Sequence, residues 1–171
     1  MRLFVGITIE PNEEIKKILA ETKKFGLRTV AEENLHINLK FLGEVDEGKM
    51  EEIKNALDSA KGFGGFEVEL RGIGAFPNAN FIRVVWIGVK SDKVVALAKL
   101  IDGELTRVGF NKETSYTPHV TLARVARKTE GVKSLLSEEE FGMQKVEEVH
   151  LMKSELSPKG PKYDKVYSVR L

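Results

Sequence analysis

Two stretches of the sequence resemble each other: NLHINLKFLG at residues 34–43 and TPHVTLARVA at residues 117–126. Each places a histidine at the head of a polar–apolar alternation that is typical of a β-strand with one buried face. The chain has only 3 histidines, and two of them lie in these segments. We therefore expect the two segments to carry the functional site.

The spacing around the histidines predicts an internal repeat. In each half, an alternating strand leads into an amphipathic helix, the helix ends at a glycine, and a histidine follows ten residues later. The glycines are Gly26 and Gly109 and the histidines are His36 and His119, so both pairs are 83 residues apart. Packing needs alone do not explain this agreement, and we predict a duplicated strand–helix–strand unit.

Hydrophobic periodicity predicts the remaining elements. The predicted strands are 2–9, 36–42, 66–73, 81–89, 118–125, 144–153 and 164–170, and the predicted helices are 11–25, 46–60, 92–108 and a short one near 130–137. This order indicates an α+β fold in a single domain over residues 1–171, in which two related lobes face each other across a central cleft.

Composition narrows the classes of function. A net charge of +1 gives no global case for a polyanionic partner, so any contact with nucleic acid must come from local arrangement. The absence of cysteine excludes disulfides and thiolate chemistry. No apolar run reaches the length of a membrane span, and the N-terminal MRLFVGITIEPNEE does not fit a signal peptide. We expect a cytoplasmic protein with no membrane partner.

The two histidine strands could perform proton-transfer chemistry together. Residues two apart on a strand share a face at about 6–7 Å, so His36 lies beside Asn38 and His119 lies beside Thr121. One neutral histidine can remove a proton from an attacking oxygen while a protonated one donates to the leaving oxygen. Polar side chains between them would hold the nonbridging oxygens of a phosphoryl group. No His, Asp or Glu cluster has metal-ligand spacing, so no metal or other cofactor is expected.

A single histidine on a strand is more often a packing or surface residue than a catalytic one. The duplication reverses this expectation, because two matched histidines, each followed by a polar residue, are costly to bury unless they are used. His150 has no such counterpart and is predicted to be an ordinary sheet residue.

These residues resemble the 2H phosphoesterase superfamily, which is named for paired His-x-Thr-x motifs. More closely, the chain is similar to the RNA 2′,3′-cyclic phosphodiesterases, also called 2′-5′ RNA ligases. The resemblance covers nearly the whole chain, through the segments RLFVGI, LHINLKFLGEV, GAFPNANFIRVVWIGV, TPHVTLARV and LMKSELSPKGPKYDKVYSVRL.

The resemblance implies two ferredoxin-like lobes and metal-independent hydrolysis of an RNA 2′,3′-cyclic phosphate to a 2′-phosphate. It also implies an ATP-independent, reversible 2′-5′ joining activity. By position, His36 would be the general acid and His119 the general base, or the two roles would be exchanged, and Thr121 would be a ligand of the phosphate. The implied partner is an RNA end, including tRNA-derived ends, and the protein is expected to be a monomer.

Two positions in the motifs depart from a simple pattern. Asn38 stands where the family has threonine; its amide can still donate to a phosphate oxygen, but it lacks the hydroxyl. The resemblance places Arg124 near the phosphate, although strict alternation puts it on the face opposite His119, so a β-bulge or the end of the strand would have to redirect it. Lys40 and Arg83 are further cationic candidates, and a solvated surface position suits each equally well.

Other functions fit the sequence less well. Residues 61–70, KGFGGFEVEL, approximate an RNA-recognition signature, but an extra glycine breaks the alternation, and a glycine-rich turn into a strand explains them better. The main alternative is an RNA-binding or 2′-5′-oligonucleotide-specific relative with weak cyclic-phosphate activity. The cleft walls that would recognise the nucleoside are not identified by the sequence; the candidates are Phe76, Tyr116 and the loop at 159–161.

Overall fold

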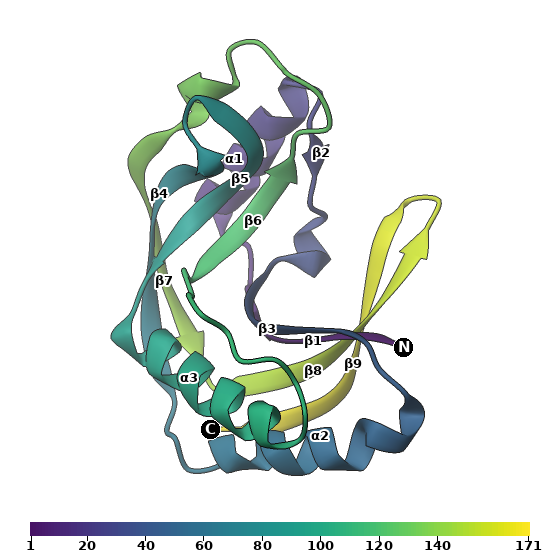
Figure 1. Ribbon diagram of the computed structural model, residues 1–171. Coiled ribbons are helices and arrows are strands. Elements are labelled where there is room, and N and C mark those ends of the chain that lie inside the picture. The colour runs from purple at the N-terminus through teal and green to yellow at the C-terminus, as the bar shows by residue number, and fades with distance from the viewer.

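The computed structural model describes residues 1–171 (Figure 1). Its strands are β1 (Arg2–Thr8), β2 (Arg28–Thr29), β3 (His36–Glu44), β4 (Phe66–Asn78), β5 (Phe81–Lys90), β6 (His119–Arg124), β7 (Ser137–Val146), β8 (Glu148–Ser157) and β9 (Gly160–Arg170). Its α-helices are α1 (Glu13–Lys24), α2 (Met50–Leu57) and α3 (Asp92–Arg107), and the short 3-10 turns are Glu32–Asn34, Glu47–Lys49, Asp58–Ala60 and Val132–Leu135. None of the helices combines the length and the apolar character that a membrane span needs.

All the strands join one curled antiparallel sheet, in the order β7-β4-β5-β6-β3-β1-β8-β9, with β2 paired to β6. The two halves of the sheet meet at a single residue pair, Ile37 of β3 with Val120 of β6. These two residues are 83 positions apart, the same offset as the histidines, so the pseudo-two-fold axis of the repeat passes through this pair. Figure 1 shows the two halves diverging from this junction. The predicted duplication and the α+β class are confirmed.

Each half of the sheet, with the helices on it, forms one lobe. The His36 lobe consists of β3, β1, β8 and β9 with α2 and α3; the His119 lobe consists of β7, β4, β5 and β6 with β2 and α1. The helices are therefore exchanged, since α1 follows β1 in sequence but packs against β2 and β6, and α3 follows β5 but packs against β3 and α2. Figure 1 shows α2 and α3 below the sheet of the His36 lobe and α1 behind the other lobe.

The helix ends follow from local sequence signals. The Asn12 side chain accepts a hydrogen bond from the Ile15 backbone N–H and caps α1, while its amide donates to the Phe141 carbonyl of β7 over 2.6 Å. Ser91 caps α3 by accepting from Val94 N–H. Each cap satisfies an amide that the helix itself leaves free.

The prediction was wrong about the segment before β8. One strand was predicted over 144–153, but two strands lie there, and the first begins at Ser137. Strand β7 is an edge strand whose residues 137–140 are all exposed, so its start carries no apolar alternation. The strand predicted over 66–73 is also longer than expected: β4 continues through Pro77, which pairs only with β5, and the turn lies at residues 79–80. A proline is tolerated there because no partner needs its missing N–H.

Candidate active site

The two histidine strands have the same local structure. In β3 and in β6, the exposure of six successive residues follows one pattern, in which the first and third are half-buried, the second, fourth and fifth are buried, and the sixth is exposed. Register shifts leave Leu39 unpaired with β1 and Leu122 unpaired with β5, so each strand has a β-bulge at the fourth position. The bulge turns the sixth residue, Phe41 or Arg124, toward the face that carries the histidine.

Both histidines are held by the same hydrogen bond. His36 Nδ1 lies 2.7 Å from the Asn34 carbonyl, and His119 Nδ1 lies 2.8 Å from the Thr117 carbonyl. A carbonyl only accepts, so Nδ1 carries the hydrogen in each ring and Nε2 is the nitrogen that gains or loses a proton. Neither Nε2 has a partner within the protein, so both are available to a substrate.

Aromatic rings fix the orientation of each imidazole. His36 packs against Phe4 and Tyr163, with ring centroids at 4.8 and 5.3 Å. His119 packs edge-on against Phe76 at 4.9 Å and lies 6.0 Å from Trp86. Rings held this way lose little freedom when a substrate binds, which favours a pre-organised pair.

The environment lowers the pKa of both histidines. Burial lowers the pKa of His36 and the pKa of His119, and the positive charge of Arg124 lowers the pKa of each further. The charge of His119 also lowers the pKa of His36. A lowered pKa favours the neutral form of an imidazole, which is the form that a general base needs.

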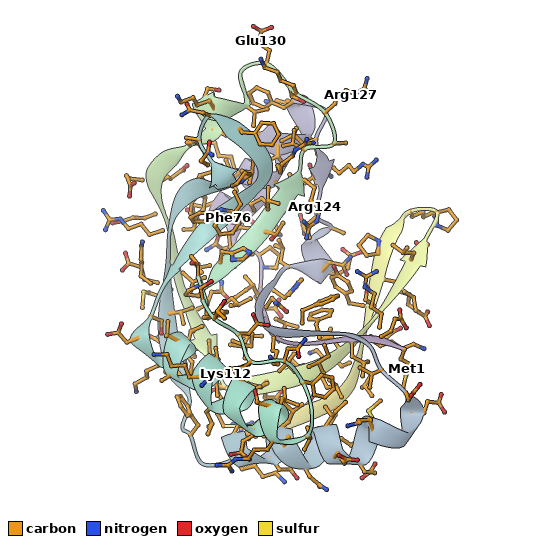
Figure 2. All side chains as sticks on the ribbon, viewed as in Figure 1. Met1, Phe76, Lys112, Arg124, Arg127 and Glu130 are labelled. Carbon is orange, nitrogen blue, oxygen red and sulfur yellow. The ribbon has the colours of Figure 1, made fainter.

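Arg124 belongs to this group, because the strand is not strictly alternating at its end. The bulge at Leu122 places Arg124 on the histidine face, where its charge acts on both imidazoles. Its side chain makes no ion pair or hydrogen bond within the protein, and Figure 2 shows it at the end of β6, with Arg127 and Glu130 farther out in the following loop.

Asn38 and Thr121 complete the polar set. They occupy equivalent positions on β3 and β6, both are half-buried, and neither side chain has a hydrogen-bond partner within the protein. Their polar atoms are accessible to solvent, so beside two free imidazole nitrogens they are suited to hold the oxygens of an anion.

The Lys40 side chain is buried and does not extend into solvent. Its side chain is 2% exposed, and Nζ donates to Asp102 Oδ1 of α3 and to the Asn111 carbonyl, both over 2.6 Å. Its third neighbour is the Glu113 carboxylate at 3.6 Å. The surface interpretation of Lys40 was therefore wrong, because the bulge at Leu39 turns it away from the histidine face toward α3. It anchors residues 109–118, which lead into β6.

A second contact ties this loop to β3. The Tyr116 hydroxyl donates to the Asn38 carbonyl over 2.8 Å, so the segment ahead of His119 is fixed to the strand of His36. Tyr116 is half-buried, and its hydroxyl is occupied by this bond, which makes it a positioning residue for the pair of strands rather than an open wall.

The other candidates are distributed as follows. Phe76 packs against His119, as above, and Arg83 lies over the exposed Phe81 ring at 4.7 Å. The loop at 159–161 forms the tip of the β8–β9 hairpin. His150 is 3% exposed and its Nδ1 lies 2.7 Å from the Ser168 hydroxyl, so it is an ordinary sheet residue.

The RNA-recognition-like segment 61–70 has a packing role. Phe66 is buried at the start of β4, and Phe63 packs against it at 5.9 Å. These rings face the core, as the glycine-rich turn predicted.

Comparisons with known proteins agree with this geometry. The RNA 2′,3′-cyclic phosphodiesterase of Methanocaldococcus jannaschii is 42% identical over 96% of this chain and 97% of its own. The protein of the same name from Archaeoglobus fulgidus is 40% identical over 95% of this chain and 96% of its own. The crystal structure of TT0787 of Thermus thermophilus superposes with a TM-score of 0.83 at 28% identity, covering 100% of this chain and 98% of the other.

The model of the LigT-like phosphoesterase family matches the chain twice, over residues 5–86 and 87–163. Each match contains one histidine strand, and the boundary between the matches lies within β5, the strand that opens the second repeat. The chain is a member of the LigT-like phosphoesterase family, with one copy of the family unit in each half.

Proposed function

We propose that this protein is an RNA 2′,3′-cyclic phosphodiesterase that opens the cyclic phosphate to a 2′-phosphate. The observation that carries the proposal is the set of unpartnered groups on one face at the lobe junction: Nε2 of His36 and of His119, with the side chains of Asn38, Thr121 and Arg124. The names of the M. jannaschii and A. fulgidus relatives support the same substrate class.

The reaction needs one water and two proton transfers. Neutral His119 takes a proton from water through Nε2 as the water oxygen bonds to phosphorus. The P–O3′ bond breaks, and protonated His36 gives its proton to the departing 3′ oxygen. The product carries a 2′-phosphate and a free 3′-hydroxyl, and the histidines have exchanged protonation states.

The remaining polar groups stabilise charge as it builds on phosphorus. Arg124 supplies a cation, Thr121 a hydroxyl and Asn38 an amide N–H, all of which can donate to nonbridging oxygens. The chain itself thus provides acid, base and cation, and we propose that the reaction is metal-independent and uses no cofactor.

The same groups support the joining reaction. A 5′-hydroxyl of a second RNA would replace water as the attacking group, and the product would be a 2′-5′ phosphodiester. One P–O bond forms as one breaks, so ATP is not required. A monomeric state, a cytoplasmic location and tRNA-derived ends as substrates stay predictions.

The test uses a short RNA that ends in a 2′,3′-cyclic phosphate, incubated in EDTA. Wild type should convert it to a 2′-phosphate, with one atom of ¹⁸O incorporated from labelled water, and His36→Ala and His119→Ala should each lose the activity by at least about a hundredfold, the low end for one acid or base. His150→Gln is the control, since it changes a histidine outside the site.

Two results would contradict the proposal. A 3′-phosphate product would mean that the P–O2′ bond breaks, and activity retained in both histidine variants would place the chemistry elsewhere. If wild type binds the RNA but leaves the end intact, the chain is the binding or 2′-5′-specific relative instead.

A further inference from the structure

Strand β2 places a second arginine opposite Arg124. The lobes diverge after the pair Ile37–Val120, and β2 takes the place of β3 beside the rest of β6. Figure 1 shows β2 alongside the end of β6 that is farther from the lobe junction. In this pairing Arg28 lies directly opposite Arg124, so their Cβ atoms are about 5 Å apart and their side chains share a face. The cation of the candidate site thus has a cationic neighbour.

The next pair along the two strands shows which face this is. Thr29 lies opposite the fully buried Ala123, and the Thr29 hydroxyl lies 3.0 Å from the hydroxyl of Thr22 in α1. The Thr29 side chain therefore points toward α1. Successive residues of a strand point to opposite faces, so Arg28 points away from α1, onto the face that carries Arg124.

No carboxylate neutralises this pair of arginines. Arg71 and Arg107 form ion pairs with glutamates at 3.5 and 2.9 Å, whereas Arg28 and Arg124 form none. Like charges directly opposite each other on antiparallel strands destabilise a sheet. An anion bound from solution would remove the repulsion between the two guanidinium groups.

Arg28 lies farther from the reaction centre than Arg124 does. The charge of Arg124 lowers the pKa of both His36 and His119, whereas Arg28 is not among the charges that act on either histidine. The Arg28 side chain is exposed at the rim of the face. Arg124 is thus the cation for the reacting phosphate, and Arg28 is suited to a second phosphate beside it.

The direction of the reaction indicates which strand carries this second phosphate. In the proposed reaction, His119 takes a proton from the attacking oxygen, and His36 protonates the departing 3′ oxygen. The attacking and departing oxygens lie roughly in line on opposite sides of phosphorus, so the group bonded to the attacking oxygen continues along the His119 lobe. Water carries no further group. The 5′-hydroxyl of a second RNA carries a nucleotide and the phosphodiester on its 3′ side.

We propose that Arg28 binds this phosphodiester and forms, beside Arg124, a subsite for the RNA that supplies the 5′-hydroxyl in the joining reaction. This inference rests on the proposed function. The 5′ oxygen bonds to phosphorus as the P–O3′ bond breaks; His119 takes the hydroxyl proton, and His36 gives a proton to the 3′ oxygen. A guanidinium binds phosphate oxygens through two parallel N–H groups, so Arg28 holds the second strand in the position from which it replaces water.

The test compares two reactions of one donor RNA that ends in a 2′,3′-cyclic phosphate: hydrolysis, and joining to a short acceptor RNA with a 5′-hydroxyl. Arg28→Gln should lower the joining rate at subsaturating acceptor by about tenfold, the low end for one hydrogen bond to a charged group. It should also reduce the slope of log rate against log salt by about 0.7, the value for one phosphate contact with a single strand. Hydrolysis without acceptor should stay within about twofold of wild type, because water carries no second phosphate. Arg28→Lys, which keeps the charge, should recover most of the joining rate.

A neutral acceptor identifies the phosphate that Arg28 contacts. A methylphosphonate at the first linkage of the acceptor removes the charge there and leaves the later linkages unchanged. Wild type should join this acceptor about tenfold more slowly than the ordinary one, for the same reason as above. Arg28→Gln has already lost the contact, so the two acceptors should differ by no more than about twofold in this variant.

Arg107→Gln is the matched control, because it removes an exposed arginine from α3 of the other lobe, and it should change neither reaction. Equal losses in hydrolysis and joining, joining that is unaffected by Arg28→Gln, or a wild type that hydrolyses but does not join would overturn the subsite and leave the proposed function standing. Absence of hydrolysis in wild type would instead refute the proposed function. Fluorescence anisotropy of a labelled acceptor RNA then tests the subsite alone, since Arg28→Gln should bind it more weakly than wild type and Arg107→Gln should not; equal binding by all three would overturn it.

Discussion

Replacing Lys40 with methionine should destabilise the protein far more than removing a surface cation does. Methionine keeps most of the length of the side chain and removes its charge. The Asp102 carboxylate, which is 12% exposed, then keeps only the Glu113 backbone N–H, at 3.2 Å, as a hydrogen-bond donor. Breaking a buried ion pair from one side costs about 3–5 kcal/mol, and the remaining donor favours the low end of this range.

The expected loss is therefore about 3 kcal/mol of unfolding free energy. With a urea dependence of about 2 kcal/mol per M, the unfolding midpoint should fall by about 1.5 M. Asp102→Asn removes the stranded charge and keeps an acceptor for Glu113, so the double variant should recover at least about 1.5 kcal/mol relative to Lys40→Met. Trp86, the only tryptophan, packs near His119 and reports unfolding by fluorescence.

Arg107→Met is the control, since Arg107 pairs with Glu104 at 2.9 Å on the same helix but is 77% exposed. Arg107→Met should lower the unfolding free energy by no more than about 1 kcal/mol. Equal midpoint shifts for the Lys40 and Arg107 variants, or no recovery in the double variant, would refute the reasoning.

Burial acts to raise the pKa of Asp102, but the bonds from Lys40 and Glu113 outweigh it and hold the pKa below the ordinary value. The loss of unfolding free energy in Lys40→Met should therefore be constant from about pH 8 to 5 and become smaller only below about pH 4.

Three further predictions concern the site. Arg124→Gln removes a charge that lowers the pKa of both catalytic candidates, so the pH profile of kcat/KM should move to higher pH as its amplitude falls; an unmoved profile would separate Arg124 from the histidines. All three histidines have a lowered pKa in the folded protein, so the unfolded chain binds more protons. Tm should therefore fall as the pH drops below about 6.5, the pKa of an unfolded histidine. His36→Gln should reduce this pH dependence, and a Tm that is constant from about pH 7.5 to 5.5 would contradict the prediction. Asn38→Leu, which keeps the size but removes the donor, should lower kcat at least about tenfold, whereas Asn38→Thr should stay within about threefold of wild type, as one lost hydrogen bond to a charged group predicts; similar rates for both variants would mean that position 38 does not touch the phosphate.

The sequence was sufficient for the parts of the fold that depend on periodicity. The period-two alternation after each histidine predicted β3 and β6 and placed Asn38 beside His36 and Thr121 beside His119. The common offset of 83 residues predicted the repeat, and the pairing of Ile37 with Val120 confirms it. These signals are local, so a single chain carries them in full.

Features that depend on neighbouring strands could not be predicted from periodicity; only the family resemblance placed Arg124 near the phosphate. A β-bulge is a mismatch of register between two strands, so the alternation within β6 gave no indication that Arg124 turns back toward the histidines. The same cause explains the wrong interpretation of Lys40, whose partner Asp102 lies 62 residues away. The exchange of helices between lobes also leaves no trace in the periodicity of either helix.

The exchange of helices across the pair Ile37–Val120 has an evolutionary consequence. A chain of roughly half this length would have closed on itself as a two-fold homodimer, with swapped helices and an active site astride the axis. In such an ancestor every change would appear twice, so threonine with asparagine, or arginine with phenylalanine, could never have faced each other. In a single chain that carries both halves, the two halves are free to differ. The residues at positions 38 and 121 differ, as do those at positions 41 and 124, so the active site is not symmetric about the axis.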